Sequence, residues 1–276
     1  MHMSANGSDQ GKSARAFAEE RRRAIVTMLE TAASVQVADL ARAFGVSAVT
    51  VRGDLDALAA DGKLRRTHGV AVSLDRALTV SVQDKRVNVN AAAKRSIARA
   101  ALAFVRDGDT IAVDSGTTAL ELVRALGTRT GVTVITADIT IANCIDESLP
   151  GVDAVLLGGT LRKGHRYLYG PIALKSLEAI HADLTFVCPG ALIPARGLMT
   201  DFPQMAELKR ALMASAEKVV ALVDASKVGG RGTYRFAGLT DVDALVMDAD
   251  PDGAVAKALD GMADGERRPD LVLTEG

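Results

Sequence analysis

Apolar residues near the start of the chain recur at the three- and four-residue spacing of a short amphipathic helix. Ile25, Met28 and Leu29 share one face of a helix that we predict over about residues 19–33. A short extended segment is predicted directly afterwards, at residues 35–37. The chain therefore begins its ordered part with a helix and a strand.

Two further helices are predicted on either side of a glycine turn. The first carries Leu40 and Phe44 on one face and ends at Gly45, because glycine adopts the left-handed conformation of a helix end without strain. Ser47 is expected to cap the next helix, since its hydroxyl can accept a hydrogen bond from an N–H group of the first turn. The apolar stripe of that helix has the i, i+4, i+7 spacing and consists of Val51, Leu55 and Leu58.

A basic, alternating segment at residues 63–74 follows the turn Asp61-Gly62, and Gly69 is its expected hairpin turn. The order helix, strand, helix, helix, hairpin is typical of a winged helix-turn-helix, whose last helix enters the DNA major groove. Arginine can read guanine, and basic hairpin residues can hold phosphates. The candidate DNA-binding residues are Ser47, Thr50, Arg52, Arg65, Arg66 and His68. A small helical bundle with a charged surface would show the same periodicity, so the pattern alone leaves both readings open.

From residue 93 the pattern changes to short apolar strands that alternate with helices. We predict strands at 110–113, 132–135, 154–157, 184–187, 219–223 and 244–247, and helices at 93–105, 119–126, 139–146 and 206–216. This alternation is typical of an α/β fold with a doubly wound, mostly parallel sheet and helices on both faces. We therefore predict a flexible tail at 1–18, a winged helix-turn-helix at 19–75, a linker at 76–92 and an α/β effector domain at 93–276.

Polar residues and glycines gather where these predicted strands end. The segment 114–118, Asp-Ser-Gly-Thr-Thr, leads from a strand into a helix, so its N–H groups, its hydroxyls and the helix dipole suit phosphate or another small anion. Lys209 and Lys227 can add positive charge. Other candidates at strand ends are Thr136, Asp138, Gly158 and Gly159. Because the carboxyl ends of parallel strands meet in one crevice, we expect a single ligand site there.

Composition narrows the class of protein further. The chain has 276 residues, of which 48% are hydrophobic and 24% charged, and a net charge of −1, so it is long and apolar enough to bury a core. Two cysteines, Cys144 and Cys188, make neither a disulfide framework nor a zinc site, and we predict no metal or cofactor. No apolar run could span a membrane and no secretory signal is visible, so we expect a cytoplasmic protein. The P-loop and dinucleotide-binding motifs are absent.

Particular motifs resemble the DeoR family of bacterial transcription regulators. Residues 44–72, FGVSAVTVRGDLDALAADGKLRRTHGVAV, are similar to the family's DNA-binding segment, and DGDTIAVDSGTT at 107–118 and DASKVG at 224–229 to its effector domain. The resemblance covers about residues 19–250 and implies an effector domain with the fold of ribose-5-phosphate isomerase that senses sugar phosphates. It implies that Ser115, Gly116, Thr117 and Thr118 hold the phosphate, and that Asp114, Thr136, Lys209 and Lys227 line the rest.

Several positions depart from the family's usual residues. Gly53 stands where Arg or Lys is usual, so we expect an altered operator preference, and Val70 stands where Gly is usual, so we expect an altered wing turn. Tyr167 stands in place of Ser and Met205 in place of Glu. Two interpretations of the second pair are open. Either both residues contact an effector that is smaller, modified or less hydroxylated than a pentose phosphate, or both pack in the core.

The resemblance implies a repressor of a carbohydrate catabolic operon that binds double-stranded operator DNA and a phosphorylated sugar or related metabolite. Two-fold symmetric operators would imply a homodimer or homotetramer. A sugar-phosphate isomerase or deaminase is the alternative, but Met205 removes the best-placed base and leaves only Asp138 and Asp201 as candidates. We therefore expect no enzyme. A protein-binding scaffold is a third interpretation that no motif supports.

Overall fold

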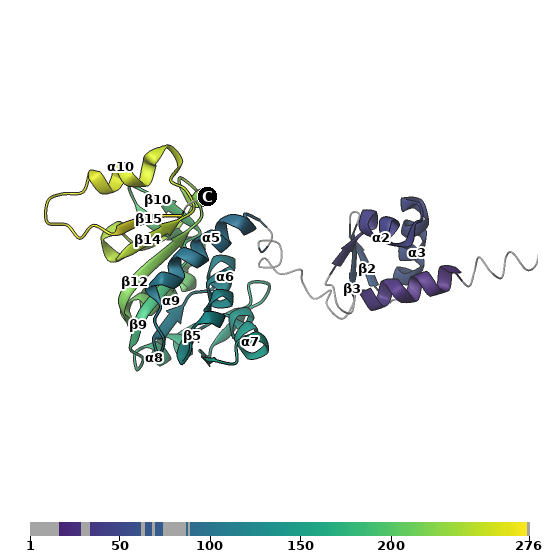
Figure 1. The fold of residues 1–276 in the computed structure, drawn as a ribbon, viewed down its shortest axis with the longest axis horizontal. Helices are drawn as coiled ribbons and strands as arrows, with labels where there is room; N and C mark the ends of the chain where they lie inside the picture. Colours follow the sequence, from purple (N-terminus) through teal and green to yellow (C-terminus); the bar gives the residue numbers. More distant parts are fainter. Residues whose placement is uncertain are drawn as a thin grey trace, which may run out of the picture. The chain divides into compact units, whose positions relative to one another are not determined.

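A computed structural model describes residues 17–28, 34–61, 64–67, 70–73, 87 and 89–274 of the chain. The chain divides into two compact units, and the division falls between Val80 and Ser81 (Figure 1). Most of the predicted tail at 1–18 and most of the predicted linker at 76–92 lie outside the described residues. Within the described residues, no helix is long and apolar enough to cross a membrane.

The N-terminal unit has the predicted order of elements. A helix at residues 17–28 is followed by β1 (Ser34–Gln36), α2 (Val37–Phe44), α3 (Ala48–Ala60), β2 (Leu64–Thr67) and β3 (Val70–Ser73). The three strands form one antiparallel sheet in the order β1-β3-β2, which joins the hairpin to the strand before α2. The described elements therefore confirm the trihelical unit with a β wing. The predicted turns at Gly62 and Gly69 lie outside the described residues.

The sequence predicted the boundary between α2 and α3 correctly. Gly45 follows α2 with a φ of 63°, the left-handed conformation that glycine adopts without strain. The Ser47 hydroxyl accepts a hydrogen bond from the Thr50 N–H at 3.1 Å and so caps α3. The predicted stripe on α3 is buried and packs against Ile25 and Leu40 of the other two helices. This apolar contact fixes the orientation of α3 within the unit.

Gly53 lies in the middle of α3 and is exposed, and a Cβ atom there would meet nothing within 4 Å. Glycine costs about 1 kcal/mol relative to alanine inside a helix, so Gly53→Ala is expected to stabilise the N-terminal unit by about that amount. Denaturant unfolding would measure the change. Gly45→Ala is the matched control of opposite sign, because Gly45 requires a positive φ. An unchanged or lower stability of Gly53→Ala would contradict the prediction.

The C-terminal unit is built on a seven-stranded sheet. Its strands, all parallel, have the spatial order β15-β14-β12-β9-β4-β5-β6. They are β4 (Thr110–Val113), β5 (Val132–Thr136), β6 (Val152–Leu156), β9 (Ala182–Val187), β12 (Ala216–Val223), β14 (Ala244–Met247) and β15 (Asp270–Leu273). The α-helices are α5 (Ala91–Ala101), α6 (Thr117–Ala125), α7 (Ile139–Ser148), α8 (Pro171–Leu177), α9 (Pro203–Ala214) and α10 (Ala254–Asp260).

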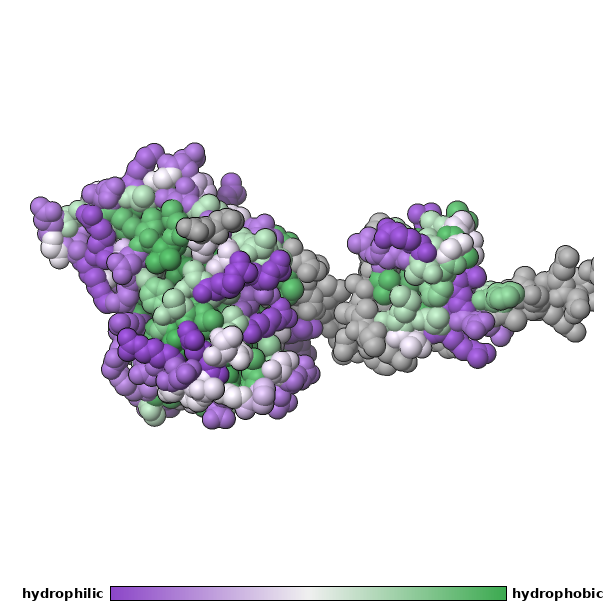
Figure 2. Space-filling model, in the orientation of Figure 1, coloured by the Kyte–Doolittle hydropathy of each residue, from purple (hydrophilic) through white to green (hydrophobic). Residues whose placement is uncertain are grey.

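Alternate residues of the strands face different layers of helices. Ile111 and Val113 of β4 pack in a core that includes residues of α5, α6 and α7, whereas Ala112 packs in a second core with residues of α8 and α9. Strands that are buried on both faces explain the near-continuous apolar runs in the sequence. The structure thus confirms the doubly wound α/β prediction. Hydrophilic residues surround the hydrophobic area on the visible face of this unit (Figure 2).

The structure adds elements that the pattern did not reveal. A hairpin of β7 (Thr160–Arg162) and β8 (Tyr167–Tyr169) follows β6, and β10 (Ala191–Ile193), β11 (Gly197–Thr200) and β13 (Tyr234–Ala237) form a separate antiparallel sheet. These strands have three or four residues, which is too short for a clear alternation. The start of α9 was predicted three residues late, because Pro203 at the first helical turn was not used as a start signal.

Candidate functional site

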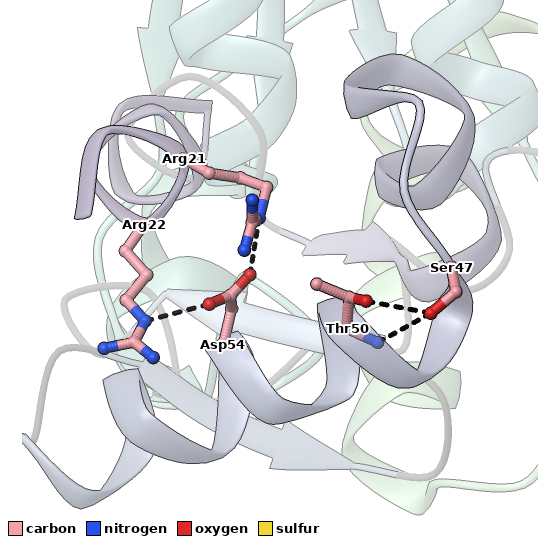
Figure 3. Close-up of polar contacts among 5 residues, drawn as sticks. All are labelled: Arg21, Arg22, Ser47, Thr50 and Asp54. Atoms are coloured by element: carbon pink, nitrogen blue, oxygen red, sulfur yellow. Dashed lines mark hydrogen bonds and ion pairs between the residues drawn. The ribbon is translucent and has the colours of Figure 1, made fainter. Parts of the chain in front are cut away.

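The start of α3 presents the polar residues predicted to contact DNA. The hydroxyls of Ser47 and Thr50 lie 2.8 Å apart, next to the capping hydrogen bond between Ser47 and the Thr50 N–H (Figure 3). Arg52 is exposed on the same helix and makes no ion pair with any residue that the structure describes. The side chains of Arg65 and Arg66, and the whole of His68, lie outside the described residues. Their DNA contacts stay predictions.

An ion-pair cluster holds the first helix against α3. Asp54 of α3 is buried, and its two carboxylate oxygens accept hydrogen bonds from Arg21 Nε at 2.6 Å and Arg22 Nε at 2.9 Å (Figure 3). No local pattern in the sequence indicates a partner for these arginines. Because the Nε–H groups of Arg21 and Arg22 are directed at Asp54, the two arginines hold α3 in position against the first helix.

The C-terminal unit contains a cavity of about 260 Å³ at the carboxyl ends of three neighbouring strands. The segments that follow β4, β9 and β12 all contribute to it, as expected for a doubly wound sheet. Its lining consists of Val89, Asn90, Lys94, Ser115, Gly116, Thr117, Thr118, Arg162, His165, Tyr167, Cys188, Pro189, Gly190, Thr200, Asp201, Phe202, Met205, Lys209, Asp224 and Lys227. Eight of the predicted effector-binding residues are in this lining: Ser115, Gly116, Thr117, Thr118, Tyr167, Met205, Lys209 and Lys227.

A buried ion pair lies beside the cavity. Lys209 Nζ of α9 contacts an oxygen of Asp114, the residue that follows β4, and both side chains are almost completely buried. Asp114 also accepts hydrogen bonds from the N–H groups of Ser115 and Cys188, each at 2.8 Å. Lys209 donates a second hydrogen bond to the Cys188 carbonyl at 2.9 Å. These contacts join α9 to the segments after β4 and β9, so they fix one wall of the cavity.

The start of α6 forms another part of the wall. Gly116 precedes the helix with a φ of 152°, and it has no side chain that could cap the first turn. Thr117 and Thr118 begin the helix and line the cavity. A helix start of this kind offers N–H donors and a positive dipole end to an anion. Burial raises the pKa of the neighbouring Cys188 thiol to about 12, so the thiol adds no negative charge near neutral pH.

A further carboxylate of the lining belongs to Asp224. Asp224 follows β12, accepts a hydrogen bond from Asn90 Nδ2 at 3.2 Å and lies 3.6 Å from Lys227 Nζ. Burial alone would raise the pKa of Asp224, but the Ser226 hydroxyl, Lys227, Asn90 and Lys94 together hold that pKa below its ordinary value. Asp224 is therefore ionised near neutral pH.

Four predicted residues at other strand ends are not among the lining residues. Thr136 is buried and its hydroxyl accepts a hydrogen bond from the Asp138 N–H, while Asp138 caps α7 through the Thr140 and Ile141 N–H groups. A Cβ atom on Gly158 would lie 3.0 Å from the Ile172 side chain, and one on Gly159 only 2.6 Å from the Tyr169 carbonyl oxygen. These contacts give each of the four residues a structural role where it stands.

Tyr167 and Met205 belong to the core and also reach the cavity, and their contact with an effector stays a prediction. Both are buried members of one core cluster, and both line the cavity. Burial, with smaller effects of Asp114 and Tyr169, raises the pKa of Tyr167 above its ordinary value despite a hydrogen bond from Arg162. The Tyr167 phenol is therefore neutral at physiological pH.

Sequence reasoning missed several lining residues, notably Asn90, Lys94, Arg162 and His165. Asn90 has a φ of 54° just before α5, within the segment predicted as linker. Arg162 and His165 belong to the β7–β8 hairpin and its turn, which had no strand signal. The one signal that could have revealed Asn90 was an asparagine directly before a helix, because asparagine tolerates a left-handed conformation. No local pattern places a hairpin over a cavity formed by distant strands.

Two family models match most of the chain. Residues 21–77 match the DeoR-like helix-turn-helix domain, and residues 89–249 match the DeoR C-terminal sensor domain. A putative aga operon transcriptional repressor of Escherichia coli O157:H7 is 34% identical over 246 residues, which cover 88% of this chain and 90% of the relative. The HTH-type transcriptional repressor GlcR of Bacillus subtilis is 30% identical over 245 residues, covering 88% of this chain and 93% of the relative.

A third relative and a solved structure extend the comparison. The HTH-type transcriptional regulator GolR of Listeria innocua is 33% identical over 233 residues, which cover 84% of this chain and 91% of the relative. Ribose 5-phosphate isomerase A of Methanocaldococcus jannaschii is 20% identical with a TM-score of 0.38, over 50% of this chain and 55% of that structure.

Proposed function

The chain belongs to the DeoR family of transcription regulators, and from that premise we propose that it is a repressor whose affinity for operator DNA is controlled by a phosphorylated sugar or a related small metabolite. One observation carries the proposal: the chain that contains a winged helix-turn-helix also contains a cavity lined by three lysines and by a helix start that a glycine precedes. The names of two relatives, a putative aga operon repressor and the repressor GlcR, support repression as the direction of control.

Fluorescence anisotropy with DNA from the region upstream of the protein's own gene tests the DNA-binding half of this proposal. We expect tighter binding to that DNA than to a scrambled sequence of the same length and composition. Equal binding to both, with a steep dependence on salt, would indicate only attraction to the phosphate backbone and would contradict sequence-specific regulation.

Arg52 is the residue we expect to read a base, because it is exposed near the start of α3. Arg52→Ala should weaken specific DNA binding by ~1–3 kcal/mol and relax the preference at one base pair. Arg268→Ala is the control, since it removes the same charge from an exposed position of the C-terminal unit. Unchanged affinity together with an unchanged base preference of the Arg52 variant would refute the assigned role.

The start of α6 is the part of the cavity that we expect to hold the phosphate. Thr117→Ala combined with Thr118→Ala should leave DNA binding intact and abolish the response of DNA affinity to the effector, because two hydroxyl groups are lost from the helix start. Thr128→Ala, at an exposed position beyond the other end of α6, is the matched control. Retained induction in the double variant would discredit this phosphate site.

We also propose that the cavity binds its ligand without converting it. Met205 lines the cavity at the position where the resemblance places glutamate, and Asp201, which also lines it, accepts a hydrogen bond from the Thr233 N–H at 3.2 Å. A coupled assay for sugar-phosphate isomerisation or deamination with the pure protein tests this point, and turnover would contradict it.

We further propose that the protein is a homodimer or a homotetramer, because either assembly fits a two-fold symmetric operator. Light scattering would detect it.

A further inference from the structure

Arg162 is a cavity residue whose side chain is held in one orientation. It lies at the end of β7, and its guanidinium carbon stands 3.8 Å from the ring centroid of Phe202. Its Nη1 donates a hydrogen bond to the Tyr167 hydroxyl at 2.6 Å. A planar guanidinium that is stacked on one side and hydrogen-bonded on an edge loses little further freedom when a ligand binds. Arg162 is therefore ready to use its remaining N–H groups.

The charge of Arg162 lacks a carboxylate partner, unlike that of two lysines in the same cavity. Lys209 pairs with Asp114, and Lys227 lies 3.6 Å from Asp224. Among the residues that the structure describes, Arg162 forms no ion pair, and its hydrogen-bond acceptor is the phenol of Tyr167. Because that phenol has a raised pKa, it stays neutral and does not compensate the guanidinium. A partly buried cation of this kind favours an anion in the space beside it.

We propose that Arg162 binds a second anionic group of the effector, so that the ligand carries two separate anionic groups, as a phosphorylated sugar acid or a sugar bisphosphate does. This inference rests on the proposed function, in which one phosphate lies at the start of α6. The guanidinium can donate two parallel hydrogen bonds to a carboxylate or phosphate. The α6 start and Arg162 come from different segments of the cavity wall, after β4 and after β6, so they can hold two separate groups of one small molecule.

Matched pairs of ligands that differ in one acidic group test the inference. Calorimetry of the full chain would compare glucose 6-phosphate with 6-phosphogluconate, and fructose 6-phosphate with fructose 1,6-bisphosphate. The variants are Arg162→Gln and Arg162→Lys. Lys163→Gln is the matched control, because it removes the neighbouring exposed charge of the same hairpin, outside the cavity lining. A thermal melt of each variant shows whether it is folded.

In the wild type, the member with two anionic groups should bind about tenfold more tightly or better in at least one pair, as a charge-assisted hydrogen bond allows. Arg162→Gln should remove this preference, Arg162→Lys should retain part of it, and Lys163→Gln should keep it. Equal affinities within both pairs, or a preference that survives Arg162→Gln, would overturn the inference and leave the proposed function intact. If no phosphorylated sugar binds or changes DNA affinity, the proposed function fails and the inference falls with it.

Discussion

Lys209→Met should destabilise the C-terminal unit by about 3–5 kcal/mol, because it leaves the Asp114 carboxylate buried without its cation. The two side chains are only 3% and 0% exposed, so water cannot replace the lost partner. Such a loss is a large part of the ~5–15 kcal/mol that stabilises an ordinary domain. Urea unfolding would measure the change, and the N-terminal unit, which has its own core, should be unaffected.

Lys175→Met is the matched control for this prediction. It breaks the Lys175–Glu178 pair, whose side chains are 79% and 64% exposed, so solvent screens the attraction and we expect little change in stability. Adding Asp114→Asn to Lys209→Met should recover part of the loss, because the uncompensated charge is then removed. A loss below about 1 kcal/mol for Lys209→Met alone would show that the pair does not fix the cavity wall.

Asp54→Ala should destabilise the N-terminal unit by about 3 kcal/mol and abolish specific DNA binding at room temperature. The Asp54 side chain is 4% exposed, and its loss leaves Arg21 and Arg22 without the carboxylate that joins their helix to α3. Arg22 is 35% exposed, so water can solvate it, and we assign most of the effect to Arg21. Circular dichroism would follow unfolding, and anisotropy would follow DNA binding.

Asp39→Ala provides the corresponding control in the same unit. Its pair with Arg42 has an N–O distance of 3.6 Å, and the two side chains are well exposed. We therefore expect a change within about 0.5 kcal/mol and no loss of fold. If Asp54→Ala melted like Asp39→Ala, the role of Asp54 in holding the first helix to α3 would be wrong.

Much of the fold could be predicted because each strand or helix carried its own signal. The strand at Ala244–Met247 is an uninterrupted apolar run, and it was predicted with its observed bounds because it is buried on both faces. Gly45 and Ser47 marked a helix end and a helix start through their own conformational and hydrogen-bonding preferences. Such signals depend on a few adjacent residues, so a single sequence reveals them.

The rest of the site depends on contacts between residues that are distant in the sequence. The Arg21–Asp54 pair spans 33 residues and the Lys209–Asp114 pair spans 95, and neither spacing has a local signature. Thr136 and Asp138 lie at a strand end as predicted, but their hydrogen bonds organise the start of α7. The partners of a polar residue decide its role, and the sequence alone does not name them.

We expect occupancy of the cavity to change the DNA affinity of the same chain. The most direct measurement is an anisotropy titration in which phosphorylated sugars are added to the protein already bound to DNA from its own upstream region. We predict that at least one of them lowers the DNA affinity of the wild type, by at least about fivefold for a coupling of ordinary strength. Saturable binding of such a ligand in the cavity, with no change in DNA affinity, would contradict the claim.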